Sequence, residues 1–426
     1  MKKLLIIGCD TTTKDVIDYC SNKNIYSILV DNSPAEKNPL KMLTNDHWEI
    51  DVVNIEELER RSLKENIDGI FSGCSELCIN SAIELSKRLN FPFYIPDKAW
   101  KATKDKEYFK EECIKAGLDV PKKISISKGF DKKVLEDIQF PIIIKPIDSS
   151  ASRGVKKCDS IDDFEQSLEY ALSFSPSKQV IIEEFIEGQM SVAYLYIVDG
   201  VVHLVATTDA LKNDDGKIVP FSRKQSLVGL SYSRRQIKFF EQHYMDKFDK
   251  LFSNLDCSFG YAAIQTIQKN GKCYCFEMNY RLDGAGEWHV TNDIFGLNPL
   301  NNAIDYCLDE KVDGHLLPKV MYDETHQSIN YLVLSKPGIV GKVNCEETRK
   351  IPGVYVVFAR FKSGDVVKDE PNLFSFAYHI TVVANSKQEL VNKVIKINET
   401  LVQKDTNGNN MLEYFDSYDV LLSSLD

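Results

Sequence analysis

The sequence predicts a multidomain protein that combines α/β and α+β architecture. Strand-like and helix-like stretches alternate over residues 1–97, which is typical of βαβ units and a parallel sheet. Residues 98–310 hold a helical stretch followed by a strand-rich block, and residues 311–426 mix short strands with one helix. Because a chain of 426 residues is too long for one compact core, we expect these three ranges to form separate domains.

The first domain is expected to carry functional loops at one edge of its sheet. Strand-like runs begin at Lys3 and Tyr26, and a third run covers residues 67–73. The loops after the first and third runs would line a crevice at the carboxyl edge of a parallel sheet. The pattern G-x-G-x-x-G does not follow the first strand, which disfavours a dinucleotide site.

Local signals mark further elements along the chain. Residues 97–118 have the spacing of a single helix, and residues 387–402 are also predicted to be helical. The dipeptides Asp-Gly at 199–200 and Asn-Gly at 270–271 predict tight hairpin turns between strands. The polar segment 404–426 is expected to be partly mobile.

Composition and charge restrict the class of protein. The formal net charge is −11, which argues against binding to nucleic acid or anionic membranes, because both need a basic face. A run of 18 or more apolar residues, which would indicate a membrane span, is absent from the sequence. The 11 cysteines are scattered without CxxC pairs, a pattern that favours reduced thiols in the cytoplasm over a zinc site. We therefore expect a cytoplasmic protein.

An apolar strand that ends in a lysine is the first motif with a chemical use. The run Pro-Ile-Ile-Ile-Lys-Pro covers residues 141–146, and a buried ammonium at Lys145 needs an anionic partner. Backbone N–H groups next to small residues can approach phosphate oxygens closely, and hydroxyls and guanidinium add donors. The alternative is a strand followed by a mobile surface hairpin. The segment that follows the strand supplies Ser149, Ser150, Ser152, Arg153 and Gly154.

Two adjacent acids mark the second motif, Val-Ile-Ile-Glu-Glu-Phe-Ile-Glu-Gly at residues 180–188. Glu183 and Glu184 follow a buried strand and offer acceptors to an adenine amino group or to ribose hydroxyls. Phe185 and Ile186 would supply apolar walls for such a ligand. The alternative is a solvated strand end.

The third motif is a strand with alternating polar residues, Tyr-Cys-Phe-Glu-Met-Asn-Tyr-Arg at residues 274–281. Glu277 and Asn279 point in the same direction on a strand, so both can offer oxygens to one cation. These hard oxygen ligands favour magnesium over zinc. Arg281 has the reach to stabilise negative charge that develops during a transfer reaction. The alternative is an edge strand with exposed polar residues.

In this order and spacing, the three motifs and the preceding Asp-Lys at 105–106 resemble the ATP-grasp superfamily, as in biotin carboxylase, carbamoyl phosphate synthase and D-alanine–D-alanine ligase. The resemblance implies a Rossmann-like N-terminal sheet, central ATP-grasp domains of two subdomains with a hinge near residues 183–188, and a small mixed C-terminal domain. The run Leu-Val-Leu-Ser-Lys-Pro-Gly at 332–338 looks, more loosely, like the closing domain of L-amino acid ligases and glycinamide ribonucleotide transformylases.

The resemblance also implies which residues bind ATP. Lys106 and Lys145 match the two lysines that grip the phosphates, and residues 149–154 match the loop that folds over them. Residues 183–186 match the hinge strand where adenine is bound. The family often has a ribose-binding glutamate two residues after the hinge glycine, and here that position holds Met190.

The metal site and the reacting group follow from the same resemblance. Glu277 and Asn279 match magnesium ligands, and Arg281 matches the arginine near the acyl phosphate, which makes Arg281 and Lys145 the implied catalytic residues. The family usually has another metal-binding glutamate twelve residues before Glu277, and here Gln265 offers a carbonyl oxygen without charge. ATP and one or two Mg²⁺ ions are the implied cofactors.

The implied activity is an ADP-forming, ATP-dependent ligation of a small-molecule carboxylate to an amine or a related nucleophile. The carboxylate would first be phosphorylated by ATP, and the nucleophile would then displace phosphate. Two alternatives stay open: a non-catalytic ATP-binding sensor or scaffold with a degenerate metal site, and a carboxylase or ligase that acts on a nucleotide-linked acceptor. The family resemblance also makes a homodimer reasonable.

Further polar residues next to these motifs are expected to contact substrate, and each has an alternative interpretation as a solvated surface residue. Glu76 follows the third strand of the first domain, and Arg223 and Lys224 lie in a long loop between strands. The residues that follow the magnesium motif are Asp283, Glu287 and His289.

Overall fold

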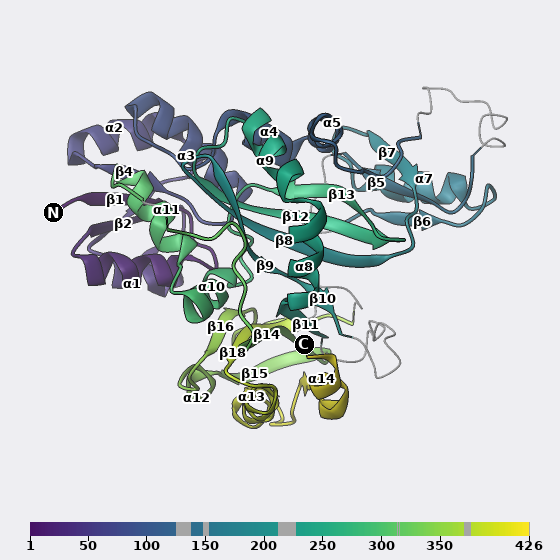
Figure 1. The fold of residues 1–426 in the computed structure, drawn as a ribbon. Coiled ribbons are helices and arrows are strands. Elements are labelled where there is room, and N and C mark those ends of the chain that lie inside the picture. Colours follow the sequence, from purple (N-terminus) through teal and green to yellow (C-terminus); the bar gives the residue numbers. More distant parts are fainter. Residues whose placement is uncertain are drawn as a thin grey trace.

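A four-stranded parallel sheet forms the N-terminal part of the chain, with strand order β3-β2-β1-β4 (Figure 1). The computed structural model describes residues 1–124, 138–147, 153–211, 227–312, 314, 316–369 and 376–425. The elements of this part are β1 (Lys3–Ile7), α1 (Thr13–Lys23), β2 (Tyr26–Asp31), η1 (Ala35–Lys37), η2 (Pro39–Leu43), β3 (Asp46–Glu49), α2 (Ile55–Glu65), β4 (Gly69–Phe71) and α3 (Glu76–Leu89). The predicted βαβ organisation is therefore confirmed.

Both faces of this parallel sheet are buried, which explains why β1 is apolar at every position after Lys3. Leu4 and Ile6 belong to one buried cluster, whereas Leu5 and Ile7 belong to another. Successive side chains of a strand point to opposite faces, so a strand covered on both faces reads as a continuous apolar run.

The loops after β1 and β4 lie side by side, as expected for the carboxyl edge of a parallel sheet. The carboxylate of Asp10 accepts hydrogen bonds from the backbone N–H groups of Thr12 (2.9 Å), Cys74 (2.7 Å) and Ser75 (3.2 Å). The two loops border a cavity of about 780 Å³, whose opposite wall includes Tyr355. The sequence therefore located this crevice correctly.

The helical stretch predicted for residues 97–118 is two helices, α4 (Asp97–Lys104) and α5 (Lys106–Ala116). Asp105 separates them because its backbone is extended and its carboxylate accepts hydrogen bonds from the N–H groups of Glu107 and Tyr108. Such an N-cap satisfies donors that the first helical turn leaves unpaired. The break places Lys106 at the first position of α5.

The central sheet is antiparallel, with strand order β13-β12-β8-β9 (Figure 1). Its strands are β8 (Gln189–Val198), β9 (Val201–Thr207), β12 (Gly260–Lys269) and β13 (Lys272–Asn279), and the helices α8 (Arg234–His243) and α9 (Met245–Asn254) pack against it. Both predicted hairpins are present. Their turn residues Asp199, Gly200, Asn270 and Gly271 all have positive φ, as a tight turn between twisted strands requires.

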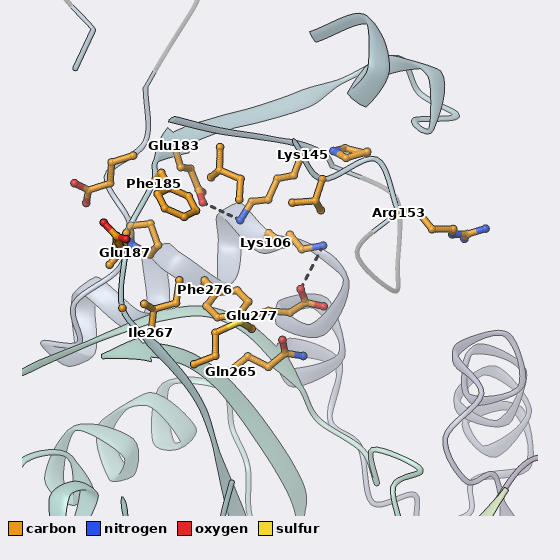
Figure 2. A pocket seen from close by; sticks show the side chains of 18 residues that line it. Lys106, Lys145, Arg153, Glu183, Phe185, Glu187, Gln265, Ile267, Phe276 and Glu277 are labelled. Atoms are coloured by element: carbon orange, nitrogen blue, oxygen red, sulfur yellow. Dashed lines mark ion pairs between the residues drawn. The ribbon is translucent and has the colours of Figure 1, made fainter. Parts of the chain in front are cut away.

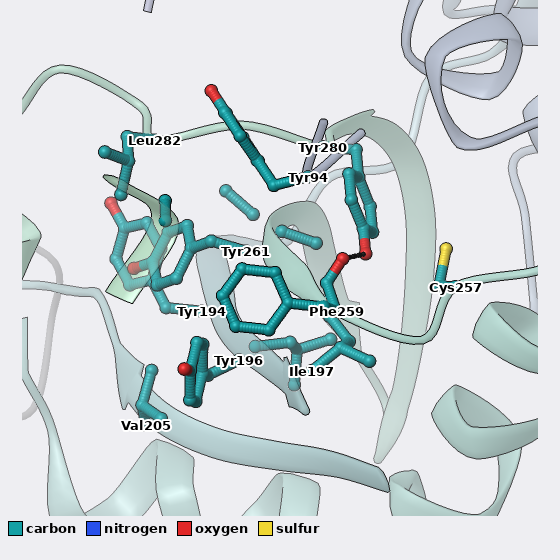
Figure 3. Packing of buried hydrophobic residues seen from close by; sticks show 14 of the residues in the cluster. Tyr94, Tyr194, Tyr196, Ile197, Val205, Cys257, Phe259, Tyr261, Tyr280 and Leu282 are labelled. Atoms are coloured by element: carbon teal, nitrogen blue, oxygen red, sulfur yellow. Dashed lines mark hydrogen bonds between the residues drawn. The ribbon is translucent and has the colours of Figure 1, made fainter. Parts of the chain in front are cut away.

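One apolar core joins the central sheet to the N-terminal elements. Helices α10 (Glu287–Phe295) and α11 (Pro299–Cys307) follow β13, and α11 packs against both β4 and β12. Phe259 stacks on Tyr306 of α11 with ring centroids 4.3 Å apart. Figure 3 shows Phe259 among the buried aromatic residues, with its carbonyl accepting a 2.8 Å hydrogen bond from the hydroxyl of Tyr280.

A smaller lobe with its own core lies at the far end of the central sheet from the N-terminal elements (Figure 1). Its antiparallel sheet has the order β6-β5-β7, and Ile142, Ile144 and Phe164 are fully buried in its core. Its elements are β5 (Ile142–Pro146), β6 (Lys156–Cys158), α7 (Phe164–Ser173) and β7 (Val180–Glu184).

The C-terminal sheet takes strands from both sides of residue 311, in the order β10-β11-β14-β18-β16 with β20 beside β14. A second sheet has the order β17-β15-β19. The elements are β10 (Asp209–Ala210), β11 (Leu227–Tyr232), β14 (Gln327–Ser335), β15 (Gly338–Asn344), α12 (Glu346–Arg349), β16 (Val354–Ala359), β17 (Val366–Val367), β18 (Phe376–Ala384), α13 (Lys387–Thr400), β19 (Val402–Asp405), β20 (Leu412–Glu413) and α14 (Tyr418–Ser424).

The C-terminal segment differs from its prediction. Residues 404–425 are ordered into elements, because Met411, Phe415 and Leu421 are buried between polar neighbours and anchor the chain in two apolar cores. The helix expected at 387–402 is present as α13. Among the described residues, none of the helices has the length and apolar character needed to cross a membrane.

Candidate active site

Motifs that are far apart in the sequence meet around a cavity of about 370 Å³ between the small lobe and the central sheet (Figure 2). This volume lies in the range of small-molecule sites. Its polar lining includes Lys106, Lys145, Glu183, Glu184, Gln265 and Glu277. Its apolar lining includes Ile143, Phe185, Ile186, Ile267 and Phe276.

Two lysines on different elements enter this cavity, and each faces an acid. The Nζ of Lys145, at the end of β5, lies 2.8 Å from an oxygen of Glu183 on the neighbouring strand β7. The Nζ of Lys106 lies 3.8 Å from an oxygen of Glu277 on β13. Figure 2 shows the two ion pairs in the same cavity. Glu183 is thus the anionic partner that the buried Lys145 requires.

A third lysine, Lys110, also contacts Glu183 and was not singled out from the sequence. It lies one turn after Lys106 on α5, and its ammonium forms an ion pair with the second oxygen of the Glu183 carboxylate. Burial and the neighbouring Lys145 lower the pKa of Lys110 to about 6, and burial and Lys106 lower the pKa of Lys145 to about 8. Lys106 and Lys110 are four residues apart, so on a helix both point to the same face, and this spacing could have identified Lys110 from the sequence.

The strand that joins the small lobe to the central sheet is held by backbone contacts. Glu184 accepts a 2.8 Å hydrogen bond from the N–H of Lys122, and the N–H of Phe185 donates to the carbonyl of Pro141 at 3.1 Å. The Glu184 carboxylate therefore holds the backbone at Lys122, in the segment before the small lobe, in place. Met190 lines the cavity and is 62% exposed.

The metal motif lies on the opposite wall of the cavity. A bulge in β13 leaves Phe276 unpaired, so that Glu277 lies directly opposite Gln265 of β12 and both line the cavity. Asn279 lies two residues further along, opposite Ala263, and is outside the cavity lining. A carboxylate and an amide carbonyl fit Mg²⁺, which usually binds one or two protein oxygens and takes its other ligands from phosphate and water.

Arg281 follows directly after β13 and faces the N-terminal domain. Its guanidinium lies 3.5 Å from the carboxylate of Glu76, at the start of α3, and donates a 3.0 Å hydrogen bond to the carbonyl of Leu282. The structure therefore brings together Glu76, which was predicted to contact substrate, and Arg281, which was predicted to be catalytic.

Asp283 and Glu287 are also brought together, whereas His289 lies elsewhere. The N–H of Asp283 donates to the Glu287 carboxylate at 2.9 Å. The Nε2 of His289 lies 3.0 Å from Asp15, and its ring stacks on Tyr355 with centroids 3.9 Å apart. His289 therefore borders the crevice of the N-terminal sheet and not the cavity of the lysines.

A comparison with known families identifies the core of this arrangement. Residues 117–281 match the family described as D-ala D-ala ligase C-terminus, and this range contains β5, β7 and β13. This match supports the resemblance of this part of the chain to the ATP-grasp superfamily.

Relatives and solved structures agree with this assignment. The chain is 23% identical over 335 residues to the carbamoyl phosphate synthase large chain, N-terminal section, of Aquifex aeolicus. The match covers 74% of this chain and 56% of that protein. The chain thus spans little more than half the length of that relative.

Two solved structures share the fold of this chain at low sequence identity. A biotin carboxylase from Campylobacter jejuni has a TM-score of 0.74 at 17% identity, covering 99% of this chain and 94% of that one. An L-amino acid ligase from Bacillus licheniformis has a TM-score of 0.74 at 14% identity, covering 96% and 99%. The multidomain α/β fold predicted from the sequence is confirmed.

Several residues of the predicted ATP-grasp phosphate loop remain untested. Arg153 lines the cavity edge, and Figure 2 shows its guanidinium directed away from the other labelled side chains. Gly154 packs against Phe174 and Pro146 instead of lining the cavity. Five predicted site residues lie outside the described residues, namely Ser149, Ser150, Ser152, Arg223 and Lys224.

Proposed function

We propose that this protein is an ADP-forming, ATP-dependent ligase that joins a small-molecule carboxylate to an amine. The observation that carries the proposal is the cavity between the small lobe and the central sheet. Lys145 enters this cavity from the small lobe, and Lys106 lies beside Glu277, which is paired with Gln265. Cationic side chains opposite oxygen ligands can hold a triphosphate and its metal ion, and the apolar walls near Phe185 suit a base.

The proposed reaction has two steps. A carboxylate oxygen attacks the γ-phosphorus of ATP, the bond to ADP breaks, and an acyl phosphate forms. The nitrogen of the amine then attacks the acyl carbon, the bond to phosphate breaks, and the nitrogen loses a proton. Lys145 and Lys106 would neutralise phosphate charge, and Arg281 would stabilise the acyl phosphate. Mg²⁺ held by Glu277 and Gln265 would supply further charge neutralisation.

The direct test is product analysis with substrate pools. The purified protein is incubated with Mg-ATP and mixed carboxylates and amines, and ADP, AMP, phosphate and pyrophosphate are measured. We expect ADP and phosphate in equal amounts, and we expect Lys145→Met to abolish their formation because the cavity loses one of its cations. AMP and pyrophosphate as products would exclude the acyl-phosphate route.

A non-catalytic ATP-binding role is the second candidate, and it is supported by the uncharged Gln265 opposite Glu277. One carboxylate binds a divalent cation less tightly than two. Gln265→Glu is therefore expected to lower the Mg²⁺ concentration needed for half-maximal nucleotide binding, about tenfold for each 1.4 kcal/mol gained. Gln268→Glu adds the same charge on β12 outside the cavity lining and serves as the control. ATP binding without turnover in both variants would favour the non-catalytic role.

A further inference from the structure

The pair Asp283 and Glu287 places two carboxylates next to each other with little solvent. Glu287 is 4% exposed, and its Oε1 accepts the 2.9 Å hydrogen bond from the backbone of Asp283. Its Oε2 has no partner among the described residues. Neither acid forms an ion pair with a lysine or arginine in the described parts of the chain. A buried carboxylate without a compensating charge is costly. A cation that bound beside this pair would therefore be stabilised.

Two tyrosines of the central sheet complete the surroundings of these acids. The hydroxyl of Tyr194 donates to Asp283 at 2.5 Å, and the ring of Tyr261 stacks beside that of Tyr194 at 6.1 Å (Figure 3). Tyr261 is 3% exposed, and its hydroxyl has no partner among the described residues. Burial, then Glu287 and Asp283, raise the pKa of Tyr261 well above its ordinary value.

The nearby basic groups do not neutralise the pair. Burial lowers the pKa of His379 to about 4 even though Asp283 opposes the shift, so its imidazole is uncharged at neutral pH. Arg281 is engaged with Glu76. Burial and Asp283 raise the pKa of Glu287 well above its ordinary value, as expected for two acids that share a site without a cation.

The loop that carries Asp283 is fixed from two sides, so these groups are held in place before any ligand arrives. The hydroxyl of Thr11 donates to the carbonyl of Gly284 at 3.2 Å, and the hydroxyl of Thr381 donates to the carbonyl of Ala285 at 2.7 Å. The N-terminal loop after β1 and the C-terminal strand β18 therefore both hold this loop. Asp283 itself is partly exposed, whereas Glu287 is buried.

We propose that Asp283, Glu287 and Tyr261 bind the primary ammonium group of the carboxylate substrate, so that this substrate is an amino acid or a close analogue. An ammonium has three N–H donors, and the unpartnered Glu287 Oε2, the Asp283 carboxylate and the Tyr261 oxygen can accept them.

This inference rests on the proposed ligase for its role in turnover, but the binding site can be tested without turnover. ADP release is measured with a pool of L-amino acids and with the matching 2-hydroxy acids, both with the same excess of a small amine as acceptor. The hydroxy acids keep the carboxylate and replace the ammonium by a hydroxyl. We expect the wild type to prefer the amino acids at least tenfold in kcat/KM. The same two pools are used in equilibrium binding by thermal shift without ATP.

Tyr261→Phe separates binding from folding, because it removes only a hydroxyl that has no partner in the described protein. Its unfolding midpoint should stay unchanged or rise, since a buried unsatisfied group is lost, while the preference for amino acids falls at least fivefold. Glu287→Gln keeps an acceptor for the Asp283 N–H and should lower the preference further. Asp305→Asn is the matched control, because Asp305 also accepts a tyrosine hydroxyl, that of Tyr19, on α11 away from this site.

The outcomes are distinguishable. ADP release that is equal with hydroxy acids and amino acids would overturn the ammonium site and leave the ligase intact. Absence of ADP with every pool, together with amino-acid stabilisation that Tyr261→Phe removes, would overturn the ligase and support the site. Absence of both ADP and amino-acid stabilisation would overturn the two proposals together. Identical behaviour of Tyr261→Phe and Asp305→Asn would overturn the ammonium site alone.

Discussion

Lys145 shows how far a single residue can be interpreted from sequence. The apolar run before it predicts burial, and burial of an ammonium predicts an anionic partner. The sequence did not identify that partner, because Glu183 was assigned to nucleotide contacts and lies on another strand. Lys110 was missed for a similar reason, since helical spacing alone does not tell which face of α5 meets the cavity. Both the partner of Lys145 and the direction of Lys110 depend on contacts between residues that are far apart in the sequence.

The pH dependence of nucleotide binding should report the charge of Lys145. Its pKa is lowered to about 8 by burial and by Lys106, so the ammonium is present below about pH 8 and lost as the pH rises. Because only the ammonium attracts phosphate, the Kd of Mg-ATP should be flat from pH 7 to 7.5 and rise between pH 8 and 9.5. Equilibrium dialysis with labelled nucleotide gives the profile.

Lys145→Arg provides the control for that profile. A guanidinium remains charged throughout this range, so the variant should show a flatter dependence even if its overall affinity is lower. An unchanged rise of Kd in this variant would assign the titration to another group.

At the scale of elements, local signals predicted turns better than they predicted helix ends. The two hairpins were predicted because residues with positive φ at both turn positions are specified within the dipeptide itself. The break between α4 and α5 was missed because Asp105 interrupts an otherwise helical spacing and acts through its own side chain. Asp105 was quoted only for its place beside Lys106, although an acid before a helical run is also a capping signal.

The loop between β13 and α10 should tolerate an added methyl group less than a hairpin does. Gly286 has φ +83°, and a Cβ there would lie 2.6 Å from Val357 and 3.0 Å from Thr381, whereas Gly271 has φ +75° and open space. Gly271→Ala should cost only backbone strain of about 1–2 kcal/mol. Gly286→Ala should cost about 1–3 kcal/mol more through overpacking. Urea unfolding midpoints compare the stability of the two variants. Equal losses of stability would show that Val357 on β16 moves aside to accommodate the added methyl group.

At the scale of the whole molecule, the parallel sheet near the start of the chain was predictable and the contacts between the sheets were not. Alternating patterns located the parallel sheet, and the resemblance supplied the succession of three motifs. Neither indicates that Thr11 and Thr381, which are far apart in the chain, hold the same loop at Gly284 and Ala285. Contacts of this kind depend on how separate lobes pack, and no local pattern encodes them.

The distribution of apolar cores predicts which part of the molecule opens most easily. One core extends from β1 to α11 and the central sheet, whereas the small lobe of β5, β6, β7 and α7 has a separate core with six buried residues among those described. Regions with little buried apolar area open at lower free energy than the global transition. Amide hydrogens of β5 and α7 should therefore exchange faster than those of β12, as measured by hydrogen–deuterium exchange with mass spectrometry.

Nucleotide should change this pattern only where it binds. Because β5 and β7 carry Lys145 and Glu183 into the cavity, Mg-ADP should slow exchange in these strands. Exchange in α13 of the C-terminal domain provides the internal reference, since this helix contributes no residue to the cavity lining. If Mg-ADP slowed exchange in α13 as much as in β5, the small lobe would not be the part that responds to nucleotide. If β5 exchanged as slowly as β12 before nucleotide was added, the separate core would be as stable as the large one.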